Sequence, residues 1–312
     1  MDVGPDGSVY FCTGGWGTEG GVYRITWTGD GGVESIPPDA SIEAAIKQPQ
    51  LLAAWAVQRT AELRDEIGDS WAPALRAIAS NSGRSIEDRI RAVDLLQIHG
   101  PQPDEQLALQ LARDQQVSIR RRATILLAGH STQQAHSALQ AMLDDADPTL
   151  LRRASEALVQ SGAEIEPDRI LPLLAHEDRF VRYAGRQLLQ RIEPVAWQET
   201  ILAAGDADTV IEGLLALHSV DPGKDLERRL AKVLEVIESV GSGSRHISGA
   251  LRVVQLLALS IDTKLPPSAA KLGGELLSRF PTGVSSVDWE LVRLLARLQV
   301  EGGADKIVAQ LN

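Results

Sequence analysis

Apolar residues recur at helix spacing through most of the chain, and between residues 85 and 192 the pattern repeats every 30 or 31 positions. Ala92, Ala123, Ala154 and Ala184 mark successive copies, and a leucine follows each alanine after four residues. Positions four apart share one face of a helix, so each copy predicts a helix with a buried face. A period of this length predicts a solenoid of stacked helix pairs rather than a single globular core.

The first 28 residues follow a different pattern. A turn is predicted at residues 4–7, and two short β-rich runs, at 8–12 and 21–27, flank a glycine-rich segment. These runs predict a β-hairpin, and two strands alone are only marginally stable in water. We therefore expect the hairpin to need a packing partner.

The patterns divide the chain into three segments. We expect residues 1–28 to form the hairpin and residues 29–50 to form a linker with a first short helix. Residues 51–312 should form a HEAT-like α-solenoid that is most regular over 85–192. The linker prediction rests on a glycine pair and a proline pair within residues 31–38. The predicted fold class is mainly α, an α–α superhelix preceded by a short β-hairpin.

The helix starts in the periodic region resemble those of short HEAT-like repeats. Such helices begin with aspartate and proline and continue with an arginine and an alanine, and DPTLLRRA at residues 147–154 matches this start closely. Residues 178–184 lack the proline but keep the aspartate, the arginine and the alanine. The resemblance implies a HEAT/armadillo-type scaffold for protein binding. Each repeat of a solenoid packs only on its neighbours and leaves an extended face free.

Residues 1–28 resemble the last blade of a sugar-dehydrogenase-type β-propeller, through the segments GPDGSVYFCTGG and GGVYRITW. In large exported bacterial proteins, planctomycete ones among them, such a propeller is followed by HEAT-like repeats and a c-type haem domain. The resemblance implies that this chain is a fragment of an exported PQQ/sugar-dehydrogenase-like oxidoreductase, a spacer whose catalytic propeller is missing. The sequence contains no Cys-x-x-Cys-His, the motif that attaches haem.

The charge balance narrows the class of partner. The chain has 31 Lys and Arg against 42 Asp and Glu, and this net charge of −11 disfavours nucleic acid and anionic membranes. Its apolar runs are too short to span a bilayer, and no targeting segment is visible. We expect a protein partner or the flanking domains of a larger polypeptide. A helical-repeat nucleic-acid binder is the remaining alternative, with Arg120–Arg122 as its best basic cluster. The compartment stays undetermined, unless the propeller resemblance holds and implies export.

Three arginines, Arg121, Arg152 and Arg182, stand two residues before the periodic alanines. This spacing predicts a ladder along one edge of the solenoid. The ladder has two interpretations: it could bind an anion or an acidic peptide, or each arginine could pair with a carboxylate at a helix start, such as Asp147 or Asp178. We favour the second interpretation, in which the arginines fix the angle between repeats.

No other motif predicts chemistry. Residues 15–20 match G-x-G-x-x-G, but a strand rather than a helix follows, so we expect a hairpin loop. The six histidines lack metal-ligand spacing, and the acidic residues 144–147 lack the glycine and the distal glutamate of a calcium loop. Cys12 is expected to be a small buried residue on a strand. We therefore expect a non-catalytic protein with no cofactor or metal site.

Overall fold

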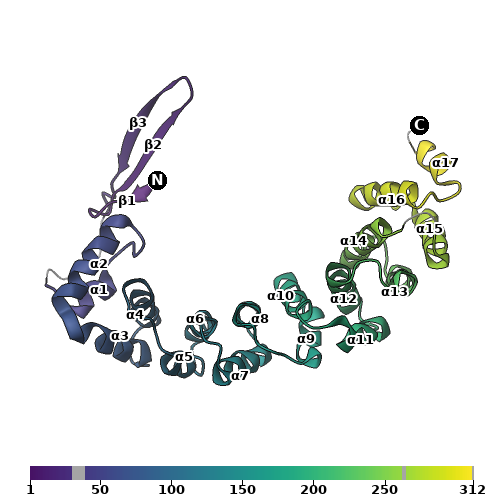
Figure 1. Cartoon of the computed structure of the whole chain (residues 1–312). Helices are drawn as coiled ribbons and strands as arrows, with labels where there is room; N and C mark the ends of the chain where they lie inside the picture. Colours follow the sequence, from purple (N-terminus) through teal and green to yellow (C-terminus); the bar gives the residue numbers. More distant parts are fainter. Residues whose placement is uncertain (30–38, 262–264, 311–312) are drawn as a thin grey trace. The chain divides into compact units, whose positions relative to one another are not determined.

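The computed structural model describes residues 1–29, 39–261 and 265–310 of the chain (Figure 1). The chain divides into two compact units, Met1–His130 and Ser131–Asn312. The glycine and proline pairs of the predicted linker lie outside the described residues.

The first unit begins with three strands, β1 (Asp2–Val3), β2 (Val9–Gly15) and β3 (Thr18–Ile25), which pair antiparallel in that order. The sequence predicted two strands and missed β1, which is only two residues long. Strands β2 and β3 also extend into the segment expected as a loop. The turn between them therefore contains Gly17, whose φ of +81° is a conformation that favours glycine.

The sheet extends away from α2 (Figure 1) and exposes much of its surface. Cys12 is exposed, which corrects the expectation that it is buried, because this part of the hairpin lies beyond the helices. Near the base of the sheet, the indole Nε1 of Trp55 donates to the carbonyl of Val3 at 2.7 Å. This hydrogen bond ties β1 to the helical part of the unit.

Helices of the first unit pack in pairs, as the periodicity predicted. Their bounds are α1 (Ile42–Lys47), α2 (Ala54–Ile67), α3 (Trp71–Ser80), α4 (Ile86–His99), α5 (Glu105–Leu111) and α6 (Val117–Leu127). Helix α3 packs on α4 and α5 on α6, while α4 also packs on α6. Two capping residues set the limits of α4. Ser85 caps its first turn at 3.1 Å from the amide of Asp88, and Gly100 ends it with a φ of +73°.

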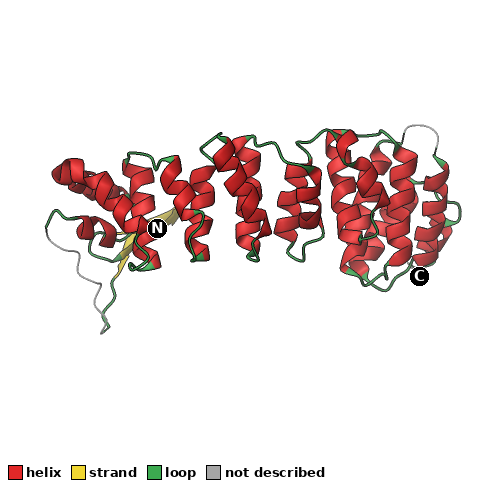
Figure 2. Cartoon of the chain, turned by 90° about the horizontal axis from the view of Figure 1, so that it is seen from below, coloured by secondary structure: helices red, strands yellow, loops and turns green. Residues whose placement is uncertain are grey.

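The second unit continues the same arrangement. Its helices are α7 (Gln133–Ala141), α8 (Pro148–Ser161), α9 (Pro167–Leu174), α10 (Arg179–Leu189), α11 (Gln198–Ala203), α12 (Ala207–Val220), α13 (Leu226–Ser239), α14 (Arg245–Leu259), α15 (Pro267–Arg279), α16 (Ser285–Arg297) and α17 (Gly303–Val308). The sequence did not predict α11, which has six residues and thus too few to show a helical period. Figure 2 shows the helices within each unit stacked side by side.

Two layers build the second unit. Helices α8, α10, α12, α14 and α16 pack each on the next, and we call them the even layer. Helices α7, α9, α11, α13 and α15 form the odd layer on its other side (Figure 1). The core between the layers contains the periodic residues Ala154, Leu158, Ala184 and Leu188, all at most 2% exposed. The mainly α fold with paired repeat helices is therefore confirmed. Among the described residues, no helix is long and apolar enough to cross a membrane.

A glycine allows close approach between the two layers at α12. A Cβ atom on Gly213 would lie 2.5–2.7 Å from three side-chain atoms of Ile201, which is fully buried on α11. Atoms do not approach so closely without a shift, because protein interiors are packed as densely as organic crystals. The short helix α11 can thus lie against α12 only because position 213 has no side chain.

Candidate functional site on helices α10, α12 and α14

Helix α10 exposes two aromatic side chains. Phe180 is 50% exposed and Tyr183 is 53% exposed. When α8 and α10 are aligned on their N-cap aspartates, these aromatics take the places of Thr149 and Arg152. Large aromatic side chains usually bury most of their surface, and those that remain exposed are enriched at protein interfaces. The aromatics thus mark this helix as the candidate site.

Two arginines on the same helix stack on these rings. The guanidinium carbon of Arg179 lies 4.7 Å from the ring centroid of Phe180, and that of Arg186 lies 5.0 Å from the centroid of Tyr183. Such cation–π contacts are weakly attractive at exposed sites. Residues 179, 183 and 186 follow helical spacing, so they share one side of α10. The four side chains therefore lie together on one side of α10, where Arg179, Phe180 and Tyr183 are exposed and Arg186 is partly buried.

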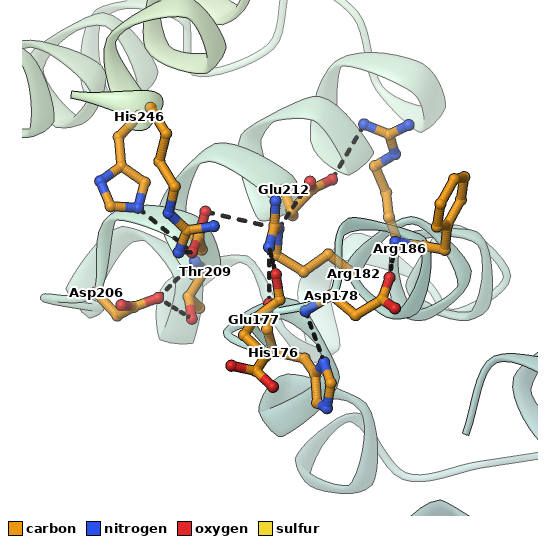
Figure 3. A network of polar contacts seen from close by, with 12 residues as sticks. His176, Glu177, Asp178, Arg182, Arg186, Asp206, Thr209, Glu212 and His246 are labelled. Carbon is orange, nitrogen blue, oxygen red and sulfur yellow. Dashed lines mark hydrogen bonds and ion pairs between the residues drawn. The ribbon is translucent and has the colours of Figure 1, made fainter. Parts of the chain in front are cut away.

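An ionic network joins α10 to α12 next to these side chains (Figure 3). The Nε atom of Arg182 lies 3.6 Å from Oδ1 of Asp208 and 3.7 Å from Oε1 of Glu212. The Nη1 atom of Arg186 lies 3.1 Å from Oε2 of Glu212. The side chains of Arg182, Asp208 and Glu212 are only 10–14% exposed. Charges so shielded from water are held in place by one another, since an unpaired buried charge is strongly destabilising.

Helix α14 reaches the same carboxylate from the other side of α12. The Nη2 atom of Arg245 lies 2.5 Å from Oδ2 of Asp208, and Nε2 of His246 lies 3.4 Å from the same oxygen (Figure 3). Asp208 on α12 is thus in contact with side chains of both neighbouring helices. The network fixes the spacing of α10, α12 and α14.

Helix caps in the local sequence place these side chains in register. Asp178 begins α10 by accepting from the amide of Phe180 at 2.7 Å. Asp206 begins α12 by accepting from the amide of Thr209 at 2.8 Å and from its hydroxyl at 2.9 Å. Aspartate at the N-cap satisfies amides that the first turn leaves unpaired. The start of each helix determines which residues of the first two turns face the network.

Burial sets the electrostatics of the network. The pKa of Glu212 lies above its ordinary value because burial disfavours the carboxylate. Arg186 and Arg182 oppose this effect, and the negative charge of Asp208 adds to it. Glu212 therefore takes up a proton more readily than an exposed glutamate does.

Arg182 also belongs to a set of arginines that donate to backbone carbonyls preceding their own helix. Its Nη1 donates to the carbonyls six and five residues earlier, at 2.8 and 2.9 Å. Arg120 makes the same two hydrogen bonds, both at 3.0 Å. Both occupy the fourth position after the N-cap, as do Arg89 and Arg229, which donate to the carbonyls of Ala79 and Asp221. Counting from the N-cap rather than from the periodic alanine would have grouped these four residues.

The predicted ladder of Arg121, Arg152 and Arg182 does not occupy one equivalent position. Arg121 and Arg152 stand fifth after their N-caps, whereas Arg182 stands fourth. Arg121 is half-buried on α6 in the first unit, and Nε of Arg152 lies 3.7 Å from Oε1 of Glu156 on the surface of α8. Arg182 alone enters the network described above. A common interaction role for the three stays a prediction.

No protein-family model and no curated protein matches the chain. Among solved structures, the chain is similar to one titled the complex of CpcE and CpcF of phycocyanin lyase from Nostoc sp. PCC7120, at 18% identity and a TM-score of 0.36. The alignment covers 76% of this chain and 100% of that chain. A likeness of this degree does not extend to activity. The propeller resemblance of residues 1–28 gains no support from these comparisons.

Proposed function

We propose that the chain is a non-catalytic helical-repeat scaffold that binds a protein partner through α10 and α14, with α12 between them. The observation that carries this proposal is the pair of exposed aromatics, Phe180 and Tyr183, each stacked with an arginine. Aromatic residues and arginine are enriched at protein interfaces, and a few such anchors supply most of the binding energy. We call the following side chains the aromatic–arginine face: Arg179, Phe180, Tyr183, Arg186, Arg245 and Arg252.

Helix α12, which lies beneath this face, favours binding because it is firmly packed. No residue of α12 from Ala207 to His218 is exposed, so α12 contributes a packed floor between two helices whose side chains reach solvent. The ion pairs of Asp208 and Glu212 hold that floor to both neighbours. A surface that is ordered before binding loses less conformational entropy when a partner arrives. This preorganisation supports a docking surface rather than a face that must first fold.

The carboxylates of the site support a structural use rather than catalysis. Asp208 and Glu212 both contact guanidinium groups, and their side chains are 10% and 14% exposed. A general acid or base needs a path to the reacting proton. Carboxylates engaged in this way instead orient the arginines of the face.

The test is selection of peptide ligands from a phage-displayed random library on the whole immobilised chain. Clones should bind the wild type and lose binding to the Phe180→Ala/Tyr183→Ala variant, because truncation of both aromatics removes the anchors. Val195→Ala is the matched control, since Val195 is exposed in the same unit but lies outside the even layer. Clones that bind both aromatic-truncated and wild-type chains equally would overturn the proposal.

A second role, pairing of the sheet with a flanking module or with a second copy of the chain, is favoured by the exposed apolar residues of β3. Val22, Ile25 and Trp27 are 81%, 60% and 75% exposed, which is unusual for apolar residues on and beside one strand. An exposed apolar strand at a sheet edge is a template for pairing with another chain. The Val22→Thr/Ile25→Thr variant keeps the preference for β-structure and removes the apolar surface. Light scattering should show concentration-dependent association of the wild type and not of the variant, and equal behaviour of both would argue against this role.

A further inference from the structure

We infer that the aromatic–arginine face binds an acidic peptide segment, in which carboxylates meet the arginines and an apolar side chain covers the rings. The inference rests on the proposed function and deepens it by assigning a charge to the partner. Three observations carry it: the distribution of charge between layers, the exclusive use of arginine, and the arginines that lack a carboxylate of their own.

Charge is separated between the two layers of the second unit. The even-layer helices carry nine arginines and five carboxylates, although the whole chain has a net charge of −11. The odd-layer helices carry six basic and six acidic residues. The nine arginines of the even layer are Arg152, Arg153, Arg179, Arg182, Arg186, Arg245, Arg252, Arg293 and Arg297. Positive charge on one layer of an acidic protein complements an acidic ligand.

The basic residues of the even layer are all arginine, and these helices contain no lysine. A guanidinium is planar, stacks on an aromatic ring through its face, and presents its N–H groups at its edge. Arg179 and Arg186 stack in this way on Phe180 and Tyr183. Stacking leaves the edge of Arg179 available to bind a carboxylate with two parallel hydrogen bonds, whereas Nη1 of Arg186 already lies 3.1 Å from Oε2 of Glu212.

Two arginines of the face are not neutralised by the chain. Within the part of the chain that the structure describes, Arg179 and Arg252 form no ion pair; Arg179 stacks on Phe180, and Nη1 of Arg252 donates to Oε1 of Gln255 at 3.1 Å. Both arginines are exposed. Their charge is available to a partner, whereas Arg186 and Arg245 are partly offset by Glu212 and Asp208.

A nucleic acid fits this face less well. A phosphate backbone carries closely spaced charges and is bound by many free cations. Here Asp208, Glu212 and Glu290 stand among the arginines of the even layer, and the overall negative charge repels a polyanion at long range. A short segment with a few carboxylates requires only two or three free arginines.

The experiment measures fluorescence anisotropy of labelled synthetic peptides of about 15 residues, long enough for a helix that spans such a face. The first peptide carries leucines on one face of a helix and glutamates beside them. In the second peptide each glutamate is replaced by glutamine, and in the third each glutamate is replaced by lysine. The whole chain is titrated at about 0.15 M ionic strength. We expect the glutamate peptide to bind about tenfold or more tightly than its glutamine twin, and the lysine peptide to bind least.

The matched variants are Arg179→Gln/Arg252→Gln in the face and Arg228→Gln in the odd layer, where Arg228 is exposed and pairs with Glu199. The face variant should lose about tenfold in affinity for the glutamate peptide, and the control should lose none. Far-UV circular dichroism of both variants verifies that each keeps the helical fold.

The outcomes test two claims separately: that the partner is acidic, and that the aromatic–arginine face is a docking surface. Equal binding of the glutamate and glutamine peptides, with binding still lost on Phe180→Ala/Tyr183→Ala, would overturn the acidic partner and keep the docking surface. Binding that is insensitive to both the arginine and the aromatic variants would overturn the proposed function itself. Tighter binding of a short single-stranded oligonucleotide than of the glutamate peptide, lost in the arginine variant, would reassign the face to nucleic acid.

Discussion

Gly213 on α12 offers a sharp test of how the two layers pack. Its replacement by alanine places a Cβ atom 2.5–2.7 Å from three side-chain atoms of Ile201. Gly274, in the helix α15 of the same unit, is the matched control because an added Cβ there meets nothing within 4 Å. The two substitutions are chemically identical and differ only in the space around them.

The structure predicts effects of opposite sign. Alanine in a helix is more favourable than glycine by roughly 1 kcal/mol, so Gly274→Ala should raise the free energy of unfolding by about that amount. At position 213 the same gain is opposed by overpacking, which typically costs about 1–3 kcal/mol. Because all three contacts with Ile201 are too short, we expect the upper end and a net loss of about 2 kcal/mol. The two variants should thus differ by about 3 kcal/mol.

Urea denaturation followed by circular dichroism measures this difference. A second variant, Gly213→Ala/Ile201→Ala, provides space for the new methyl group, so its destabilisation should be less than the sum of the two single effects. Stabilisation by Gly213→Ala equal to that by Gly274→Ala would refute the close approach of α11 and α12. Additive single effects would show that Ile201 is not the residue that the methyl group meets.

Three further predictions concern single contacts. Glu212→Gln removes a carboxyl group whose pKa is higher in the folded state than in the unfolded state, so protonation of Glu212 favours the folded state. As the pH falls from 7 towards 4.5, the ordinary pKa of glutamate, the free energy of unfolding of the wild type should therefore rise relative to that of the variant. Urea titrations at both pH values measure this gain, and a constant difference would contradict it. Asp114→Ala leaves the guanidinium of Arg89, 2% exposed, without its carboxylate and should cost about 3–5 kcal/mol of unfolding free energy. A loss below about 1 kcal/mol in urea, as for an exposed pair, would refute the buried pairing. Trp55→Phe removes the hydrogen bond to Val3, so hydrogen exchange of the backbone amides in β1 and β2 should become faster, while amide exchange in α4 stays the same. Unchanged exchange in the two strands would show that other contacts hold the sheet.

Much of the fold follows from local rules that act within a few residues. Ser85, Asp206 and Ser244 are residue types typical of helix starts, and each accepts a hydrogen bond from an amide of the first turn of its helix. The alanine–leucine spacing likewise identified the buried face, because burial of that face is what keeps the helix in place. Such signals depend on composition at short range and need no knowledge of the neighbouring helix.

Contacts between distant residues escaped the sequence analysis. Asp208 reads as an ordinary first-turn acid of α12, and only packing brings Arg182, Arg245 and His246 around it. The exposed aromatics did leave a signal, since Phe180 and Tyr183 stand at positions where α8 has polar residues. Aligning copies on the periodic alanine hid this, because α10 has one residue fewer between its N-cap and that alanine than α8 has.

Strand β1 and helix α11 were missed for a different reason. Each is too short for its own periodicity, and each is stabilised by contacts from outside the element. Strand β1 pairs with β2 and receives the Trp55 hydrogen bond, while α11 packs on α12 across Gly213. Short elements of this kind form because of tertiary contacts and not because of propensity.

The central claim, that the aromatic–arginine face is a docking surface, is tested most directly by one comparison. Peptides selected on the whole chain are titrated against the wild type, the Phe180→Ala/Tyr183→Ala variant and the Val195→Ala control. Because two central aromatics are removed, we predict a loss of affinity of about 100-fold in the double variant and none in the control. Equal affinity for all three chains would contradict the claim.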